Sequence, residues 1–376
     1  MSTTAVYIHV PFCRRKCLYC DFQSQPYRPG DEVTYLEAIR REISLRAGET
    51  TGPADTIYFG GGTPSVVSGH VLPTILDAIV QSIGIAAEAE VTAEANPESV
   101  RPDVLAAWRR AGVNRLSLGV QAWQDTLLHV LGRLHDRAAV VRAYELARAA
   151  GFTNVSVDLM FGLPGQTMRD WEETLAAVVA LGPEHVSAYA LQVEEGTPFH
   201  RLVSAGRLTL PDEDTQADMY EWLRAAMASA GYEHYEISNF ARPGFRCRHN
   251  LVYWNNGDYT GFGPAAWSHR GRRRWGNTAE LAVYAAELAN GLMPVAQEEI
   301  VGDREAMGET MMLGLRLVEG VSDSEFRARF GLGVAEAFGP EIADLTGRGL
   351  VVYRDGHWQL TSRGLLLGNV VFGAFV

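Results

Sequence analysis

Short apolar segments alternate with amphipathic helical segments through the first half of this 376-residue chain, and this alternation limits the fold more than any other feature. The apolar segments recur at intervals of about 25 to 50 residues, and a segment with helical periodicity follows each one. The predicted strands are 6–10, 56–59, 90–93, 115–119, 155–159 and 186–191. Strands that alternate with helices at this spacing form parallel sheets with right-handed crossovers. The sequence therefore predicts a β/α barrel, or an open part of one.

The helical segments each have one apolar face, as expected for helices that cover a sheet. In segment 31–47, apolar side chains recur every three or four residues, and Asp31 is predicted as the N-cap. Further helices are predicted over 138–150 and 168–181, and another has Pro102 in its first turn. In barrels of this kind the chemistry collects at the carboxyl ends of the strands.

The pattern changes after about residue 200. A long helix is predicted over 212–230, and a stretch rich in glycine, asparagine and aromatic residues follows it. From about residue 300 the chain has three predicted helices, the last over 334–346, and then a hairpin turn at Asp355-Gly356. These features predict a small helix-rich domain with a β-wing. The predicted parts of the chain are a barrel in 1–235, a connecting segment in 236–298 and a C-terminal domain in 299–376.

Charge and composition argue against several classes of protein. A net charge of −12 opposes general binding to nucleic acid or to an anionic membrane surface. With 47% hydrophobic residues, the chain can bury a large core. Neither a signal peptide nor a run of about 18 apolar residues is found. We therefore expect a cytoplasmic protein without an integral membrane segment and without a nucleic-acid partner.

Three of the four cysteines lie within eight positions, directly after the first predicted strand, with the spacing C-x3-C-x2-C. Cys13, Cys17 and Cys20 can hold three irons of a [4Fe–4S] cluster, whereas most such clusters have four cysteine ligands. One iron stays open if Cys247, which is far away in the sequence, is not a ligand. An open iron can bind the amino and carboxylate groups of S-adenosylmethionine. The motif therefore predicts a cluster that holds this cofactor.

A structural zinc site is the alternative interpretation of the cysteines. Zinc takes four ligands in such sites, so His9 or Cys247 would have to supply the fourth. The spacing matches the usual paired knuckles poorly, and the cluster is therefore favoured. Iron and sulfide analysis of anaerobically purified protein separates the two.

Glycines and polar side chains mark the carboxyl ends of the other predicted strands. The second strand runs into Gly60-Gly61-Gly62-Thr63, where the backbone can approach a ligand because no Cβ intervenes. A polar side chain lies at or near the end of each later strand, and any one of them alone is often a helix cap or a satisfied core group. These are Glu94, Gln121, Asp158 and Tyr189. Four such groups around one barrel mouth indicate a shared ligand, and a ribose with an amino-acid head would suit them.

Together these motifs resemble the radical SAM superfamily, in the branch of the oxygen-independent coproporphyrinogen III oxidases and the HemW-type haem chaperones. The resemblance is carried by YIHVPFC at 7–13, the cysteine loop, GGGTP at 60–64, GVQ at 119–121, GRLH at 132–135 and DLMFGLPGQT at 158–167. It implies an α/β fold: a partial (β/α)6 TIM-type barrel with a C-terminal helix-rich, winged-helix-like domain. It also implies a [4Fe–4S] cluster on Cys13, Cys17 and Cys20. The implied S-adenosylmethionine contacts are Tyr7, Tyr19, Gly61, Gly62, Thr63, Glu94, Gln121, Arg133 and Asp158.

Two departures from the oxidase pattern favour the chaperones. Oxidases of this branch carry a fourth motif cysteine, and Phe22 stands at that position. They also have a long segment before the motif, whereas only twelve residues precede Cys13. A haem chaperone is therefore the expected function, without coproporphyrinogen oxidase activity. Radical oxidative decarboxylation of coproporphyrinogen is the alternative.

The segment 249–254 reads HNLVYW and resembles the H-N-x-x-Y-W motif associated with haem binding in the chaperones. A neutral imidazole is a good axial ligand for haem iron, and aromatic rings can pack on a porphyrin. The resemblance implies that His249 contacts haem. The alternative is that His249 bonds a loop while Tyr253 and Trp254 fill a core. Haem as cargo implies apo-haemoproteins as acceptors, and a homodimer is a further possibility.

Overall fold

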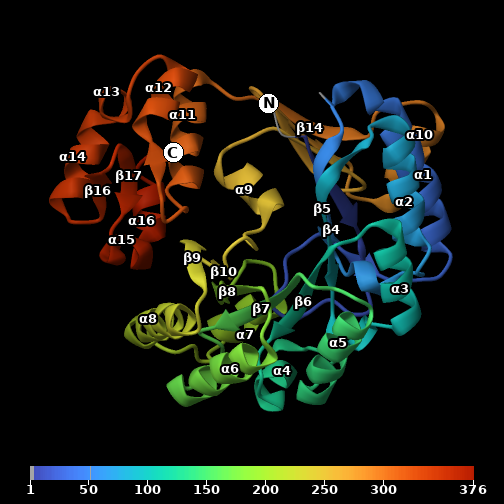
Figure 1. The fold of residues 1–376 in the computed structure, drawn as a ribbon, viewed down its shortest axis with the longest axis horizontal. Helices are drawn as coiled ribbons and strands as arrows, with labels where there is room; N and C mark the ends of the chain where they lie inside the picture. The colour runs from blue at the N-terminus through green and yellow to red at the C-terminus, as the bar shows by residue number, and fades with distance from the viewer. Residues whose placement is uncertain (1–3, 51) are drawn as a thin grey trace.

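A curved mixed sheet organises the computed structural model, which describes residues 4–50 and 52–376 (Figure 1). Within these residues the sheet has 12 strands, in the order β14-β13-β12-β11-β1-β4-β5-β6-β7-β8-β10-β9. The strands from β1 to β8 in this order are parallel. They are β1 (Ala5–Val10), β4 (Ala54–Gly61), β5 (Ile85–Ala95), β6 (Arg115–Gln121), β7 (Val155–Phe161) and β8 (His185–Ala190). The predicted set of six β/α units is confirmed.

Strands from later in the chain extend both edges of this parallel sheet. β11 pairs parallel with β1, and β12 to β14 continue antiparallel from it. At the other edge β10 and β9 pair antiparallel beyond β8. The added strands are β9 (Glu233–Glu236), β10 (Asn239–Ala241), β11 (Tyr259–Phe262), β12 (Trp267–Arg270), β13 (Arg273–Asn277) and β14 (Val295–Ile300). With both edges extended, the described sheet stays an open, partial barrel. The segment 236–298 thus contributes strands to the sheet, and the division of the chain at 235 and 298 stays a prediction.

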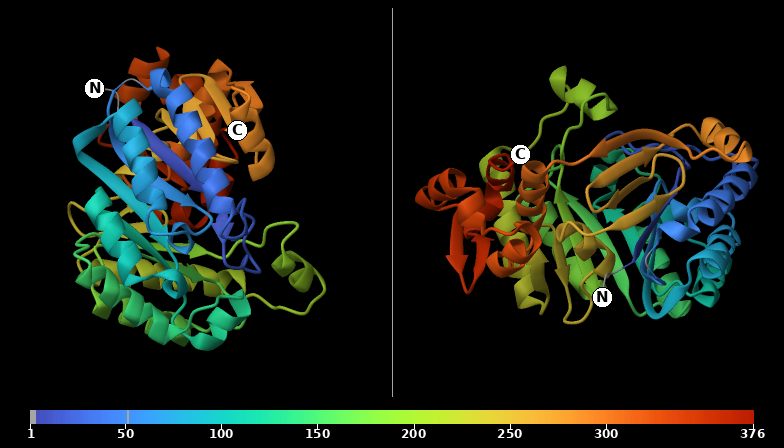
Figure 2. Two further views of the ribbon diagram at one scale, coloured as in Figure 1. Left: turned by 90° about the vertical axis from the view of Figure 1, so that its right-hand side faces the viewer. Right: turned by 90° about the horizontal axis from the view of Figure 1, so that it is seen from above.

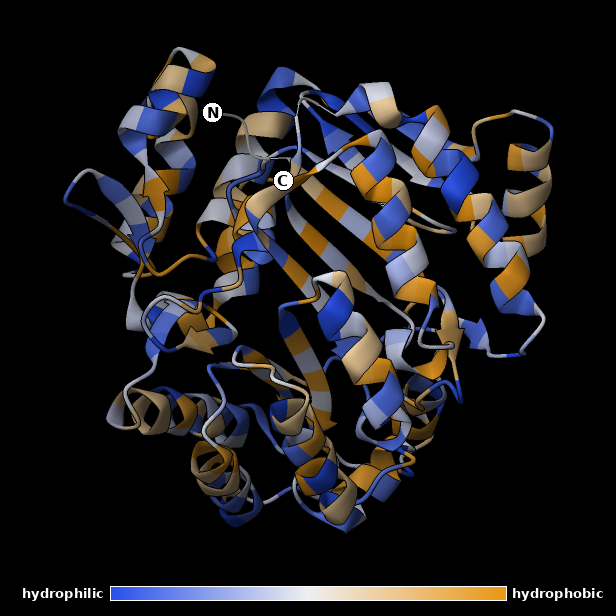
Figure 3. Ribbon diagram, turned by 45° about the vertical axis from the view of Figure 1, so that its right-hand side comes forward, coloured by the Kyte–Doolittle hydropathy of each residue, from blue (hydrophilic) through white to orange (hydrophobic). Residues whose placement is uncertain are grey.

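The helices that alternate with the parallel strands cover the outer, convex face of the sheet (Figure 2). They are α1 (Asp31–Leu45), α2 (Val71–Ser82), α3 (Pro102–Ala111), α5 (Arg137–Ala149), α6 (Met168–Leu181) and α8 (Glu213–Ser229). Their apolar stripes lie against strands that are themselves strongly hydrophobic (Figure 3). This packing makes the main core and leaves the strand ends and the concave face for other groups. No helix in the described part of the chain combines the length and apolar character needed to cross a membrane.

Two details of the helices differ from the predictions. Asp31 is the first residue of α1 rather than its N-cap, because Gly30 already has helical dihedral angles (φ −70°, ψ −25°). The Asp31 carboxylate instead accepts a hydrogen bond from Gln25 Nε2 at 3.0 Å. The single helix predicted over 334–346 is divided at Phe338 into α13 (Val334–Ala337) and α14 (Gly339–Gly347).

The C-terminal region has a hydrophobic core of its own, built from helices and a small sheet. Asp355 and Gly356 both have positive φ, 50° and 81°, which confirms the predicted hairpin turn between β16 and β17. The elements are α11 (Asp303–Gly314), β15 (Val321–Ser322), α12 (Asp323–Phe330), β16 (Val351–Arg354), β17 (His357–Leu360), α15 (Ser362–Leu366) and α16 (Gly368–Phe372). In Figure 1 this region lies beside the open side of the sheet, with α9 (Arg248–Trp254) between them.

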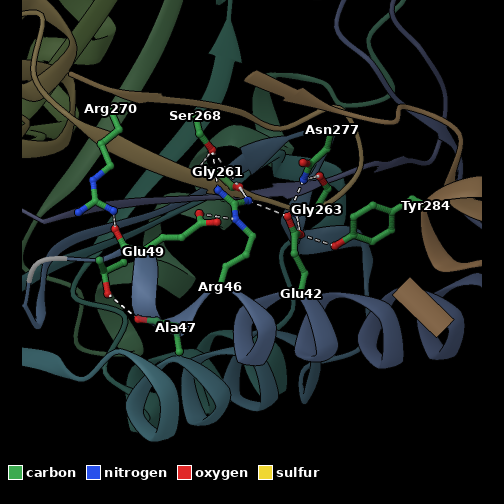
Figure 4. Close-up of polar contacts among 11 residues, drawn as sticks. Glu42, Arg46, Ala47, Glu49, Gly261, Gly263, Ser268, Arg270, Asn277 and Tyr284 are labelled. Atoms are coloured by element: carbon green, nitrogen blue, oxygen red, sulfur yellow. Dashed lines mark hydrogen bonds and ion pairs between the residues drawn. The ribbon is translucent and has the colours of Figure 1, made fainter. Parts of the chain in front are cut away.

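A buried ion pair on α1 joins the helix layer to the added strands (Figure 4). Glu42 Oε1 and Arg46 Nη1 are 2.8 Å apart, and neither side chain is exposed. Arg46 also donates to Gly261 O on β11 and to Ser268 Oγ on β12. Glu42 accepts from Gly263 N, Asn277 Nδ2 and Tyr284 Oη, the last from α10 (Leu281–Ala289). Both charges are therefore fully compensated by hydrogen bonds.

Candidate functional site

The three motif cysteines lie on one partly exposed loop that follows β1. Cys13 ends the short strand β2 (Phe12–Cys13), and Cys20 N donates to Cys17 O at 3.3 Å. Burial, together with the neighbouring Cys17 and Cys13, raises the pKa of Cys20 to about 11. Three accessible sulfur ligands on one loop fit a cluster that takes three protein ligands.

This loop is held from two sides. Leu18 N donates to Leu131 O at 3.2 Å, at the end of α4 (Asp125–Leu131). Leu18 O accepts from Phe199 N at 3.0 Å, on α7 (Pro198–Ser204), which stands on the long arm in Figure 2. Tyr19 packs edge-on against the Phe199 ring, with centroids 6.3 Å apart. The predicted contact residue Tyr19 is therefore a half-buried side chain of the cysteine loop itself.

The glycine run supports the start of the cysteine loop. Gly62 N donates to Val10 O at 2.8 Å, and Thr63 N donates to Phe12 O at 2.7 Å. A Cβ atom at Gly62 would lie 2.5 Å from the Phe12 carbonyl oxygen, so only glycine fits there. Gly61 has φ +100° and faces the His9 ring. The run thus brings its backbone to the point where the cysteine loop begins.

Arg133 connects the cysteine loop to the strand ends. Its Nη1 lies 3.4 Å from Cys17 Sγ, and its Nη2 donates to Asn96 Oδ1 at 2.6 Å and to Gly119 O at 2.8 Å. Its Nε is buried without a hydrogen-bond partner in the described structure. A cation at this place would offset the negative charge of a thiolate-bound cluster.

Asn96 is a site residue that the sequence predictions missed. Besides binding Arg133, its Nδ2 donates to Thr63 Oγ1 at 2.9 Å, and Thr63 Oγ1 lies 3.4 Å from Cys13 Sγ. Asn96 follows β5 directly. A polar residue at the end of a predicted strand was therefore the sequence signal that could have identified it. Asn96 links the Arg133 and Cys13 sides of the loop into one network.

We predict that Gly119→Ala disturbs this network. A Cβ atom at Gly119 would lie 2.6 Å from Asn96 Oδ1 and 3.3 Å from Arg133 Nη2, so the Asn96 amide that accepts from Arg133 must shift. We expect a loss of stability of about 1–3 kcal/mol and a lower iron content after reconstitution, measured by denaturant unfolding and iron analysis. Gly339→Ala is the control, because nothing lies within 4 Å of the added atom. Equal iron content in the two variants would contradict the role given to Arg133.

Glu94 is a buried carboxylate at the end of β5. Tyr58 Oη donates to Glu94 Oε1 at 2.8 Å, and Gly60 lies beside the carboxylate. Burial, together with the Asp158 carboxylate, raises the pKa of Glu94 to about 7. A ligand with a positive charge or with N–H donors would stabilise the ionised form. Tyr7 stacks on the Tyr58 ring at 6.4 Å, so the structure brings Tyr7 and Glu94 to the same region.

Asp158 and Gln121 complete the predicted set. The Asp158 carboxylate accepts hydrogen bonds from Ser117 Oγ at 2.9 and 3.0 Å and from Ser156 Oγ at 3.3 Å. Burial raises the pKa of Asp158, and these hydroxyls oppose the rise. Gln121 ends β6 with φ +68°, a left-handed conformation that a non-glycine residue adopts rarely. Tyr189 on β8 has a side chain that is 42% exposed.

His249 lies in the interior, away from the cysteine loop. Its Nδ1 is 2.9 Å from Thr56 Oγ1 and its Nε2 is 2.8 Å from Tyr253 Oη. It is fully buried, and burial lowers its pKa to about 3. Both nitrogens are therefore used within the protein, so an iron bond would require α9 to move. The predicted haem contact stays a prediction with this condition attached.

Neither candidate for a fourth zinc ligand is free in this structure. His9 Nε2 is 2.8 Å from Gln23 O, and its Nδ1 is 3.2 Å from Tyr7 Oη. Cys247 is buried, and its Sγ is 3.7 Å from Glu90 Oε1 in the sheet interior. Burial raises the pKa of Cys247 to about 12. In the described residues, no three side chains of the metal-binding types converge on a single ion.

A cavity of about 530 Å³ lies on the other side of Arg133, between α4 and α5. Besides Arg133, its polar lining includes Glu98 and His135, which pair with each other at 3.1 Å. Arg133 is the one predicted contact residue in its lining. Arg133 is therefore shared by the cavity and the strand-end network.

Comparison with known proteins agrees with this geometry. Residues 7–178 match the family model of the Radical SAM superfamily, and residues 302–367 match that of the HemN C-terminal domain. Coproporphyrinogen III oxidase (HemN) from Escherichia coli, a radical SAM enzyme, has the same fold. The TM-score is 0.85 at 24% identity, over 100% of this chain and 90% of that chain.

Full-length relatives are more similar in sequence. Heme chaperone HemW of Bacillus subtilis is 40% identical, with 99% of each chain covered. The proteins of the same name are 41% identical in Mycobacterium tuberculosis (97% and 93% covered) and 35% identical in Escherichia coli (99% and 98% covered). The chain therefore belongs to the radical SAM superfamily, in the family of the heme chaperone HemW.

Proposed function

We propose that this protein is a haem chaperone, which binds haem and transfers it to apo-haemoproteins. The observation that carries the proposal is the similarity to Heme chaperone HemW of Bacillus subtilis, 40% identical with 99% of each chain covered. Because this similarity includes both the sheet and the C-terminal region, it extends well beyond the cysteine motif. We also propose a cytoplasmic location and keep a homodimer as an expectation.

We further propose that Cys13, Cys17 and Cys20 hold a [4Fe–4S] cluster. Support comes from three accessible thiols on one loop, from Arg133 beside them, and from the distant burial of Cys247. The fourth motif position holds Phe22, which is 63% exposed and offers no thiol. When bound, the cluster supplies a low-potential electron and an open iron for the amino and carboxylate groups of S-adenosylmethionine.

The residues around the strand ends would then hold the rest of S-adenosylmethionine. The glycine run offers backbone groups next to the cysteine loop, and Glu94 offers a carboxylate for N–H or O–H donors and for positive charge. Gln121, Asp158, Tyr7 and Tyr19 would be further contacts, as the resemblance implies. The chain's own part is to orient the cofactor and to keep its charges compensated.

Haem titration of the anaerobically reconstituted full-length protein tests the function. We expect the Soret band of haem to shift on binding, and to move again to the holo-protein position when apo-myoglobin is added as acceptor. The measurement is absorption spectroscopy. Serum albumin serves as the control, because it binds haem without being a chaperone. A Soret band identical to that of free haem in buffer would refute the proposal.

Oxidase activity is the second candidate, because one solved structure with the same fold over the whole chain is an oxidase. At 24% identity the likeness concerns the fold, and Phe22 departs from the oxidase motif. Formation of protoporphyrinogen from coproporphyrinogen, under anaerobic conditions with S-adenosylmethionine and a reductant, would establish this function instead.

A further inference from the structure

Helix α9, which carries the HNLVYW segment, packs against the strands beneath the strand-end site. Its first turn is fixed on β5, because Glu90 accepts from Arg248 N at 3.2 Å and from His249 N at 3.1 Å. His249 also reaches β4 through Thr56 Oγ1. In Figure 1 the helix lies at the centre of the molecule, beside β4 and β5. α9 therefore faces the interior of the sheet.

Tyr58 connects this helix to the predicted cofactor site. Its ring stacks on His249, with centroids 5.2 Å apart and planes inclined by 26°. The same ring stacks on Tyr7, and its hydroxyl donates to Glu94 Oε1 at 2.8 Å. The contacts run in one series from α9 to Glu94. No feature of the sequence had singled out Tyr58, which lies mid-strand between two apolar neighbours.

His249 holds Tyr58 in this series and is itself held rigidly. Its second nitrogen bonds Tyr253 Oη, and the two rings meet edge to face at 5.0 Å. At the far end of the motif, Arg316 lies over the Trp254 ring at 4.4 Å and pairs with the buried Glu236 at 3.3 Å. The motif residues are thus engaged on both sides, toward β4 and toward the C-terminal region.

We infer that Tyr58 is a positioning residue that fixes Glu94 for its ligand, and that His249 serves this site by holding Tyr58 rather than by binding iron. The inference deepens the proposed function and rests on it, because it requires that Glu94 contacts S-adenosylmethionine as proposed above. It assigns the HNLVYW segment to the floor of the cofactor site.

The charges around Glu94 give this role a measurable signature. Four ionisable groups face it: Tyr58 from β4, Tyr7 from β1, Asp158 from β7 and Tyr253 from α9. Burial holds the pKa of Glu94 near 7, Asp158 raises it, and the Tyr58 hydroxyl lowers it. Since the ionised carboxylate is the better acceptor, affinity rises with pH through this pKa. Removal of the hydroxyl raises the pKa and moves the rise to higher pH.

Tyr58→Phe tests the inference, because it keeps the stacked ring and removes only the hydroxyl. S-adenosylmethionine is titrated calorimetrically into anaerobically reconstituted full-length protein between pH 6 and 9. We expect the midpoint of the affinity profile to move up by about one pH unit. That shift weakens binding about fivefold at pH 7 and leaves it unchanged near pH 9. The titration of the cofactor's own amino group is common to both proteins and cancels in the comparison.

Tyr232→Phe is the matched control. The buried Tyr232 hydroxyl also donates a hydrogen bond, to Pro183 O at 2.6 Å, but it lies outside the cofactor site. Its profile should follow the unmodified protein. A Tyr58→Phe profile with an unshifted midpoint overturns the inference, and so does an absence of cofactor binding by the unmodified protein.

His249→Phe, which retains an aromatic ring against Tyr58, separates the two roles of His249. We expect the Soret shift with haem to persist in this variant, with circular dichroism to show that it folds. Loss of the Soret shift with an unchanged cofactor profile would make His249 an iron ligand and overturn the inference. If the unmodified protein gives no Soret shift, the chaperone function fails while the Tyr58 comparison still stands.

Discussion

Cys17→Ser should abolish the iron–sulfur cluster. Cys17 is the central one of the three proposed ligands, and its Sγ is the one beside Arg133 Nη1, at 3.4 Å. A cluster with only two protein ligands is exposed on two corners and dissociates. We expect iron and sulfide to fall from about four of each per chain, as a [4Fe–4S] cluster requires, to near zero. Elemental analysis after anaerobic reconstitution, together with the visible absorption of the cluster, measures the loss.

Cys247→Ser provides the matched control in the same experiment. Cys247 is buried beside Glu90, on the side of the sheet interior, and serine can keep the contact with that carboxylate. This variant should retain its full iron and sulfide content. If it loses as much iron as Cys17→Ser, Cys247 is a fourth ligand and the open iron does not exist. One zinc per chain without sulfide would instead establish the structural zinc site.

Arg46→Met should cause the largest loss of stability among single substitutions outside the candidate site. The change leaves the Glu42 carboxylate without its partner at a place where neither side chain is exposed. Removing one member of a buried, hydrogen-bonded ion pair costs about 3–5 kcal/mol, because the remaining charge stays desolvated. The contacts to Gly261 O and Ser268 Oγ are lost as well, so β11 and β12 loosen from α1. Denaturant unfolding followed by circular dichroism measures the effect.

The double variant Glu42→Gln with Arg46→Met distinguishes this cause from lost packing. With both charges removed, no uncompensated ion remains, and the amide can still bond Tyr284 and Asn277. We expect the double variant to be more stable than Arg46→Met alone. If the two losses simply add, the buried charge is not the reason for the effect.

Much of the parallel sheet could be predicted because its signals are local. Apolar strands and one-sided helices record their period in the chain, and the crossover rule then fixes the order of neighbours. The cysteine loop was equally predictable, since three cysteines within eight positions lie on one loop in any fold. Asp31 shows the limit of such signals. Its residue type suits an N-cap, but Gly30 takes a helical conformation and moves the helix start by one residue.

The sequence predicted the strand-end residues as separate positions, but it did not predict which residues they contact. Asn96 meets Arg133, and Tyr58 meets Glu94, only because the fold brings the strand ends and the chain after α4 together; the partners are 37 and 36 positions apart in the sequence. Likewise, the stretch after residue 231 carries short strands whose pairing depends on edges made by other parts of the sheet.

His249 shows the difference most clearly. The sequence by itself determined the residue type, a neutral imidazole that can bind iron or accept a hydrogen bond, and it determined the six-strand pattern and the three thiols. Only the tertiary structure decided that this imidazole lies between Thr56 and Tyr253 with both nitrogens engaged. The physical reason is distance along the chain: periodicity and spacing record contacts within one element, whereas burial and pairing arise when elements far apart are packed together.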